Sequence, residues 1–150
     1  MNTLKHIFFT ITVLSTISCE TKVPDTDINC SMLSDKDGII YDDGNKFNGS
    51  CFTLYDFNLE KDEIRSYKRG ERHGVWVKYY GNGQLQYMGN ARNGEIHGDY
   101  VDFYINGQIK EKGKMKKGYR DGQWLLYNDS GKLIRLENHQ NKMLIDVKNF

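Results

Sequence analysis

The sequence of 150 residues predicts an all-β fold, an antiparallel meander of repeated β-hairpins that forms an open, elongated and curled sheet. Three observations predict it. Glycines recur with a period of 24, as at Gly70, Gly94 and Gly118. Bulky residues recur with the same period, and Asn-Gly pairs, which favour tight hairpin turns, separate the alternating segments. An internal repeat of this length is typical of arrays in which each unit packs on its neighbours.

The period divides the chain into four units. The bulky positions include the series Trp76, Tyr100 and Trp124, with parallel glycine series before and after it. We place the repeats at about 47–70, 71–94, 95–118 and 119–142. The first is a degraded copy whose offset from the second is either 24 or 25, and the pattern fades after residue 140.

Two-residue turns set the expected pairing of the strands. Asn82-Gly83 and Asn93-Gly94 predict type I′ turns, because Asn and Gly tolerate the positive φ that both central positions need. These turns place Trp76 opposite Gly89, and Gly89 opposite Gly98. A ring can then lie over a cross-strand glycine, so we expect the strand glycines to serve close packing and the turn glycines to serve φ.

Alternation along the strands assigns the side chains to two faces. One face carries Trp76, Tyr80, Leu85, Tyr87 and Tyr100, and we expect it to be the better packed. The opposite face also carries apolar columns, but glutamine and lysine side chains interrupt them.

The same pairing gives two further expectations. Asp102 lies opposite Glu111, which we interpret as a surface pair. Trp124 lies opposite Glu137 and not opposite a glycine, which predicts looser packing at the end of the sheet.

The N-terminus has the pattern of an export signal. A lysine precedes a short apolar run that ends at a small residue before Cys19. We interpret residues 1–18 as a signal peptide, Cys19 as the lipidated residue, 19–40 as a tether or cap, and 41–150 as the repeat domain. Ordinary secretion and a retained anchor are the alternatives. The expected location is the cell envelope, as a membrane-anchored lipoprotein on the periplasmic or outer surface.

Export places the domain in an oxidising compartment. With Cys19 lipidated, Cys30 and Cys51 remain, an even number. A disulfide between them is one interpretation, and two buried free thiols are the other.

The charge distribution bears on possible partners. The formal net charge is +1, so bulk attraction to nucleic acid is not expected. Residues 25–63 carry ten acidic and three basic residues, whereas residues 64–150 carry sixteen basic and nine acidic. This asymmetry has three interpretations. The charges are simply solvated, the acidic part docks on the basic repeats, or the basic part faces anionic lipid headgroups.

No set of residues predicts catalysis. His73 and His97 lie one period apart, but strands two places apart separate their backbones by roughly 10 Å. Both nitrogens would have to lie about 2 Å from a shared zinc ion. We therefore expect no metal site, no cofactor, no catalytic residue and no small-molecule substrate.

The repeat resembles a known family. The segments HGVWVKYYGNGQL and DGQWLLYNDSGKL, with Tyr100 in the place of Trp in the repeat between them, resemble the bacterial variant of the MORN repeat, as in YwqK-family antitoxins. The resemblance covers Phe47 to about Leu136. It implies hairpins in a row, and a scaffold, a lipid-surface contact or a protein-binding platform. The antitoxin role of that family is cytoplasmic, which fits poorly with an export signal.

These observations lead to one expected function. The chain is interpreted as a lipid-anchored binding module that presents a MORN-type sheet to a protein partner in an antitoxin-like or immunity-like role. The alternative is a structural scaffold on anionic membrane or cell wall. The possible residues of contact with the partner or membrane form a basic cluster: Lys112, Lys114, Lys116, Lys117 and Arg120. The other interpretation of this cluster is a solvated turn.

Overall fold

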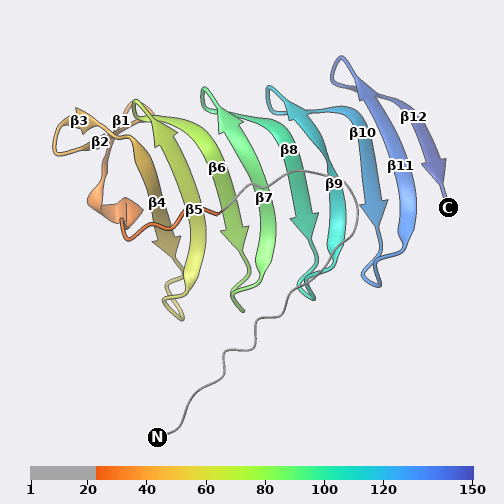
Figure 1. The fold of residues 1–150 in the computed structure, drawn as a ribbon, viewed down its shortest axis with the longest axis horizontal. Coiled ribbons are helices and arrows are strands. Elements are labelled where there is room, and N and C mark those ends of the chain that lie inside the picture. Colours follow the sequence, from red (N-terminus) through yellow and green to blue (C-terminus); the bar gives the residue numbers. More distant parts are fainter. Residues whose placement is uncertain (1–22) are drawn as a thin grey trace, which may run out of the picture.

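A nine-stranded antiparallel sheet forms the body of the protein, in a computed structural model that describes residues 23–150. Its strands follow one another in chain order, so the predicted open meander is confirmed (Figure 1). The strands are β4 (Gly49–Leu54), β5 (Lys61–Lys68), β6 (Glu71–Tyr79), β7 (Leu85–Arg92), β8 (Glu95–Phe103), β9 (Ile109–Lys116), β10 (Tyr119–Tyr127), β11 (Leu133–Gln140) and β12 (Met143–Asn149). The hairpins β4–β5, β6–β7, β8–β9 and β10–β11 coincide with the four predicted repeats, and β12 lies beyond the last.

A small N-terminal cap covers the β4 end of the sheet. It contains the 3-10 turn η1 (Cys30–Met32) and a three-stranded sheet of β1 (Ser34–Lys36), β2 (Ile39–Asp42) and β3 (Asn45–Lys46). The boundary expected at residue 41 falls inside β2, so the cap extends further along the chain than the sequence indicated. Its segment before β1 also pairs with β4, because the Phe52 N–H donates to the carbonyl of Ile28 at 2.9 Å.

Two contacts fasten the cap. Cys30 and Cys51 form a disulfide with 5.0 Å between their Cα atoms, and Cys51 is 1% exposed. Gly70 fits tightly under β2, because a Cβ there would lie 2.5 Å from Ile39 Cγ2. The Ile40 N–H donates to the Gly70 carbonyl at 2.9 Å. The cap is thus bonded to the first repeat at β4 and at the turn after β5.

Apart from the four-residue loop between β4 and β5, where the Tyr55 N–H donates to the Glu60 carbonyl, the hairpin turns of the large sheet are of two kinds, and one prediction about them was wrong. Arg69-Gly70, Asn93-Gly94 and Lys117-Gly118 have positive φ at both residues, as type I′ turns require. Asn82 does not have positive φ. The Gly83 N–H donates to the Tyr80 carbonyl and the Tyr80 N–H to the Gln84 carbonyl, so this loop has three residues and ends in a left-handed glycine.

A register shift of β7 against β8 contradicts a second prediction. Gly89 pairs with Tyr100 and not with Gly98, because β8 bulges between Ile96 and Tyr100. Gly98 has φ of +89°, and the equivalent Gly74 and Gly122 also have positive φ and lie at equivalent shifts. These strand glycines therefore serve backbone conformation at bulges, and the prediction that only the turn glycines do so was wrong.

Ring-on-glycine packing is present between repeats. Trp76 pairs with Gly89 as predicted, but the ring nearest to Gly89 is that of Tyr100 from the next strand. A Cβ on Gly89 would lie 3.1 Å from Tyr100 Cδ2, and one on Gly113 would lie 2.5 Å from Trp124 Cδ2. Each ring thus covers a glycine of the neighbouring strand, which couples the strands along the array.

The expected looseness around Trp124 was wrong. Trp124 does pair with Glu137, yet its side chain is 1% exposed. Its ring covers Gly113, lies 5.8 Å from the Tyr100 ring and carries the Arg120 guanidinium 4.2 Å above it. The bulge in β10 turns the ring back over β9, so Glu137 does not determine how tightly it packs.

Candidate binding surface

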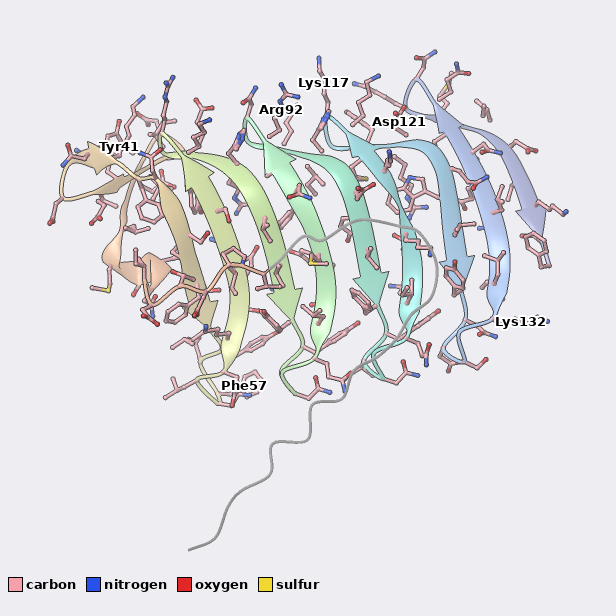
Figure 2. The ribbon with its side chains drawn as sticks, viewed as in Figure 1. Tyr41, Phe57, Arg92, Lys117, Asp121 and Lys132 are labelled. Atoms are coloured by element: carbon pink, nitrogen blue, oxygen red, sulfur yellow. A yellow bond between two sulfur atoms is a disulfide. The ribbon has the colours of Figure 1, made fainter. Side chains whose placement is uncertain are left out.

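The two kinds of turn lie at opposite ends of the strands, so each kind runs along one long side of the sheet. We call these two sides the turn edges, as distinct from the outermost strands. Figure 2 shows Arg92 and Lys117 at the edge of the type I′ turns, and Phe57 and Lys132 at the other edge. Consecutive turns on one edge are separated by two strands, which is about 10 Å. A residue type that recurs with the repeat therefore forms a row along one edge.

Cations form such a row at the edge of the type I′ turns. We call this row the basic rim, and it consists of exposed side chains at the strand ends and in the turns: Lys68, Arg69, Arg92, Lys116, Lys117 and Lys142. Lys68, Arg92 and Lys116 occupy equivalent positions at the ends of β5, β7 and β9.

Backbone hydrogen bonds hold the rim in place. In three of the turns the glycine N–H donates to a carbonyl at the start of the same repeat, from Gly94 to Arg72 at 3.0 Å and from Gly118 to Ile96 at 2.9 Å. Gly70 makes the equivalent bond to Phe47 at 2.8 Å. The rim cations of these three turns therefore rise from a backbone that is hydrogen-bonded in place, so only their side chains need to be ordered on binding.

The rim is not neutralised by the protein itself. Within residues 23–150, none of its six cations takes part in an ion pair, although Glu71 and Glu95 lie across the turns from Lys68 and Arg92. Toward β12, Lys116 faces Tyr119, and Lys142 lies 4.0 Å from the ring of Tyr119. The charge of the rim is thus available to a partner, and its C-terminal end carries no acid across the turn.

A cleft of about 470 Å³ opens where the rim meets the cap. Its lining contains three cations and one carboxylate and consists of Lys46, Lys68, Arg69, Glu71, His73 and Asn93. A neighbouring cleft of about 400 Å³ lies against β2 and includes Arg65, Tyr67 and Arg72. The lining of this second cleft carries both signs of charge, because Asp35 and Glu71 lie there with the two arginines.

The five cluster residues that the sequence suggested do not form one patch. Lys116 and Lys117 belong to the rim. Lys112 and Lys114 lie on the face opposite Trp76, and the ammonium of Lys112 lies 5.7 Å from the Tyr127 ring. Arg120 is on the tryptophan side of the sheet, so the cluster is divided between two faces and one edge.

The guanidinium of Arg120 is already occupied. It donates to Glu111 at 2.6 Å and to Glu137 at 2.9 Å. Glu137 is 6% exposed and also accepts from Arg135, with His139 3.0 Å away. Burial acts to raise the pKa of Glu137, but His139 and Arg120 outweigh it and lower that pKa. This network supports the sheet and leaves Arg120 little capacity for a partner.

Asp102 and Glu111 do pair across the β8–β9 hairpin as expected. Each has its own cation, Lys110 at 3.3 Å for Asp102 and Arg120 for Glu111. The arrangement is a set of ion pairs and not an acid–base couple.

A ladder of aromatic rings runs along the tryptophan face. Trp76, Tyr87, Tyr100 and Trp124 follow one another with centroids 5.0 to 6.0 Å apart. Burial raises the pKa of Tyr100 to about 12 and that of Tyr87 still further from its usual value. Both phenols stay neutral at physiological pH, so they contribute packing and no charge.

The edge opposite the rim is bonded differently. The hydroxyl of Tyr80 donates to the Phe103 carbonyl at 2.8 Å, and that of Tyr104 to the Tyr127 carbonyl at 2.9 Å. The hydroxyl of Tyr55 makes the equivalent bond to the carbonyl of Tyr79. Because Tyr55 and Tyr80 are equivalent, the offset of the first repeat is 25, and Cys51 takes the place of Trp76 in it.

Other expected sites have the following positions. His73 and His97 lie on β6 and β8, with β7 between them. Among residues 23–150, no three His, Cys, Asp or Glu side chains are grouped so that they could hold a metal ion. None of the helices in that range is long and apolar enough to cross a membrane. Cys19 and the predicted signal peptide lie outside the described residues.

The rim is not apparent in any continuous segment of the sequence. Lys110 to Arg120 is dense in cations along the chain, whereas the rim is assembled from positions one full repeat apart. The column Lys68, Arg92 and Lys116 was the available signal.

Comparison with protein families identifies two of the hairpin units. Residues 72–93 and 120–141 match the MORN repeat variant. Searches of curated proteins and of solved structures found no significant match. The matched segments are β6–β7 and β10–β11, and the hairpin between them has the same three-residue turn and the same glycine bulge. The chain therefore contains MORN-variant repeats, joined into a single continuous sheet.

Proposed function

We propose that the chain is a non-catalytic, lipid-anchored binding module of the cell envelope whose basic rim engages an acidic surface on a protein partner. MORN repeats are generally modules that bind membranes or proteins. One observation carries the proposal: the rim is a row of exposed cations on fixed turns, and none of them is paired within the described residues. The role of such a complex is antitoxin-like or immunity-like in this interpretation.

The carboxylates beside the rim favour a protein over a lipid surface as the partner. Glu71 and Glu95 are exposed beside Lys68 and Arg92. A uniformly anionic surface would repel these carboxylates, whereas a protein can oppose each charge with its opposite and gain specificity from the pattern.

Charge reversal at the rim tests the proposal. In Arg92→Glu/Lys116→Glu, we expect loss of the partner that co-purifies with the wild type from a cell-envelope extract, measured by quantitative mass spectrometry. The matched control is Lys61→Glu/Lys132→Glu, which makes the same charge change away from the rim, with Lys132 at the opposite edge (Figure 2). Equal recovery of the partner by both variants would exclude the rim as the contact.

The alternative function is a structural scaffold on anionic membrane or cell wall. The C-terminal half of the rim favours this alternative, because Lys116 pairs with Tyr119 across the turn and not with a carboxylate. Vesicles in which roughly a third of the lipid is anionic test it. The scaffold is supported if the wild type and the control variant bind these vesicles, the rim variant does not, and no protein co-purifies. Binding should also weaken as salt increases.

The lipid anchor needs a separate test. Labelled palmitate should enter the wild-type protein and not Cys19→Ala. An unlabelled wild-type protein would remove the anchor from the proposal and leave the rim unaffected.

A further inference from the structure

The outer edge of β12 has unusual side chains for an exposed edge. All seven residues of β12 are exposed, and the apolar ones include Met143 at 65%, Ile145 at 58% and Val147 at 42%. Within the described residues, β12 pairs only with β11, so one row of its backbone N–H and C=O groups has no partner strand. Long apolar edges invite pairing with another strand, and natural proteins usually protect them.

The backbone direction of β12 fixes which residues can bond outward. The Phe150 N–H donates to the Ile134 carbonyl at 3.0 Å, toward β11. Backbone groups alternate between the two sides of a strand, and the pairing with β11 continues in register through Lys148 to Asp146. Val147 and Asn149 therefore direct their N–H and C=O groups away from the sheet.

We infer that β12 pairs with β12 of a second copy of this chain, antiparallel about a two-fold axis through Val147. Val147 of both copies would form the central hydrogen-bonded pair, because both of its backbone groups point outward. The register of β12 against β11 shifts at Ile145, so the regular part of this pairing runs from Asp146 to Lys148. The two sheets then form one continuous sheet, in which the tryptophan faces of both copies lie on the same side.

Charge complementarity selects this register. With Val147 on the axis, Asp146 of each copy lies opposite Lys148 of the other, which forms two cross-strand ion pairs. Within residues 23–150 neither side chain has an ionic partner; Asp146 accepts from the Asn138 amide at 3.4 Å, and Lys148 lies 4.9 Å from the Phe150 ring. The neighbouring registers with allowed hydrogen bonding place Asp146 against Asp146 or Lys148 against Lys148, and like charges directly opposite are destabilising.

A charge swap tests the pairing and its register together. Sedimentation velocity of the full chain as purified should show a dimer that forms with increasing concentration. Asp146→Lys and Lys148→Asp each place like charges opposite one another, so each should weaken dimerisation at least roughly tenfold. An equimolar mixture of the two variants restores opposite charges at both positions and should recover association. Both side chains are exposed, so circular dichroism and Tm should stay as in the wild type.

A covalent measurement checks the axis independently. Val147→Cys should form a reducible dimer under mild oxidation, whereas Asn149→Cys should not, because Asn149 of one copy lies far from Asn149 of the other. A wild type that stays monomeric up to about 1 mM overturns the inference. So does self-association that neither charge variant weakens, or equal crosslinking of the two cysteine variants. The rim plays no part in these outcomes, so they leave the proposed function unaffected.

Discussion

The two ends of the sheet differ in how their outermost strands are covered. At the β4 end, the cap contributes a strand segment beside β4, a turn contact at Gly70 and the disulfide from Cys30 to Cys51. At the β12 end, the strand is exposed along its length and the described residues place nothing beside it (Figure 1). A repeat array needs its terminal units protected, and here only one end is protected within the described part of the chain.

The comparison shows where the stability of each end resides. The first repeat has Cys51 in the position that Trp76 and Trp124 occupy in later repeats, so a covalent bond to the cap replaces a ring contact. The last full repeat contains Trp124, the largest fully buried side chain of residues 23–150. The C-terminal end is therefore stabilised by Trp124 on β10 and not by β12, so β12 remains available to pair with another strand.

The largest expected effect is at Trp124. Trp124→Ala should lower the free energy of unfolding by about 3–5 kcal/mol, because it leaves a cavity over Gly113 and removes the ring beneath Arg120. Urea denaturation followed by circular dichroism measures the loss. Trp124→Phe, which keeps an aromatic ring, should lose less. A loss below about 1 kcal/mol in the alanine variant would mean that the ring does not anchor this end.

Reduction of the disulfide should have the next largest effect. The Cys30–Cys51 bond closes a loop with a sequence separation of 21, so breaking it should cost roughly 3 kcal/mol on the chain-entropy model. Unfolding with and without a phosphine reductant measures the change. The variant Cys30→Ala should already have the lower stability and should not respond to the reductant. If the wild type does not respond either, the cap is held by its noncovalent contacts alone.

The tyrosine bonds between repeats should contribute less. Tyr104→Phe removes the hydrogen bond to the Tyr127 carbonyl and should cost about 0.5–1.5 kcal/mol. The control is Tyr119→Phe, whose side chain is 47% exposed. Equal losses in the two variants would show that the bond at this edge adds nothing to the coupling of the hairpins.

The smallest effect is expected on β12. Ile145→Thr changes an exposed side chain and should shift the free energy of unfolding of the monomer by no more than about 0.5 kcal/mol. Thermal unfolding at low protein concentration measures it. A larger destabilisation would show that β12 supports the monomer and would weaken the contrast between the two ends.

The sequence by itself determined the repeat, the strand order and most of the register. The repeat period located four hairpins, and the pairings of Trp76 with Gly89 and of Trp124 with Glu137 followed from counting along the chain between turns. The repeat period is a local property, which explains why it could be predicted without coordinates. The turn at Asn82-Gly83 was predicted wrongly, and the pairing of Trp76 with Gly89 holds because a register shift at Tyr79 compensates for the longer loop.

Only the tertiary structure decided where the residues lie relative to the next repeat. The shift at Gly98 depends on a bulge, and a glycine at that position is compatible with either a bulge or a close contact. The equivalent shift in β10 turns Trp124 over Gly113 and buries it. The basic rim likewise depends on strands that return to one edge, because its cations lie one repeat apart in the chain. Neighbouring strands supply these interactions through space, so no continuous segment of the sequence contains them.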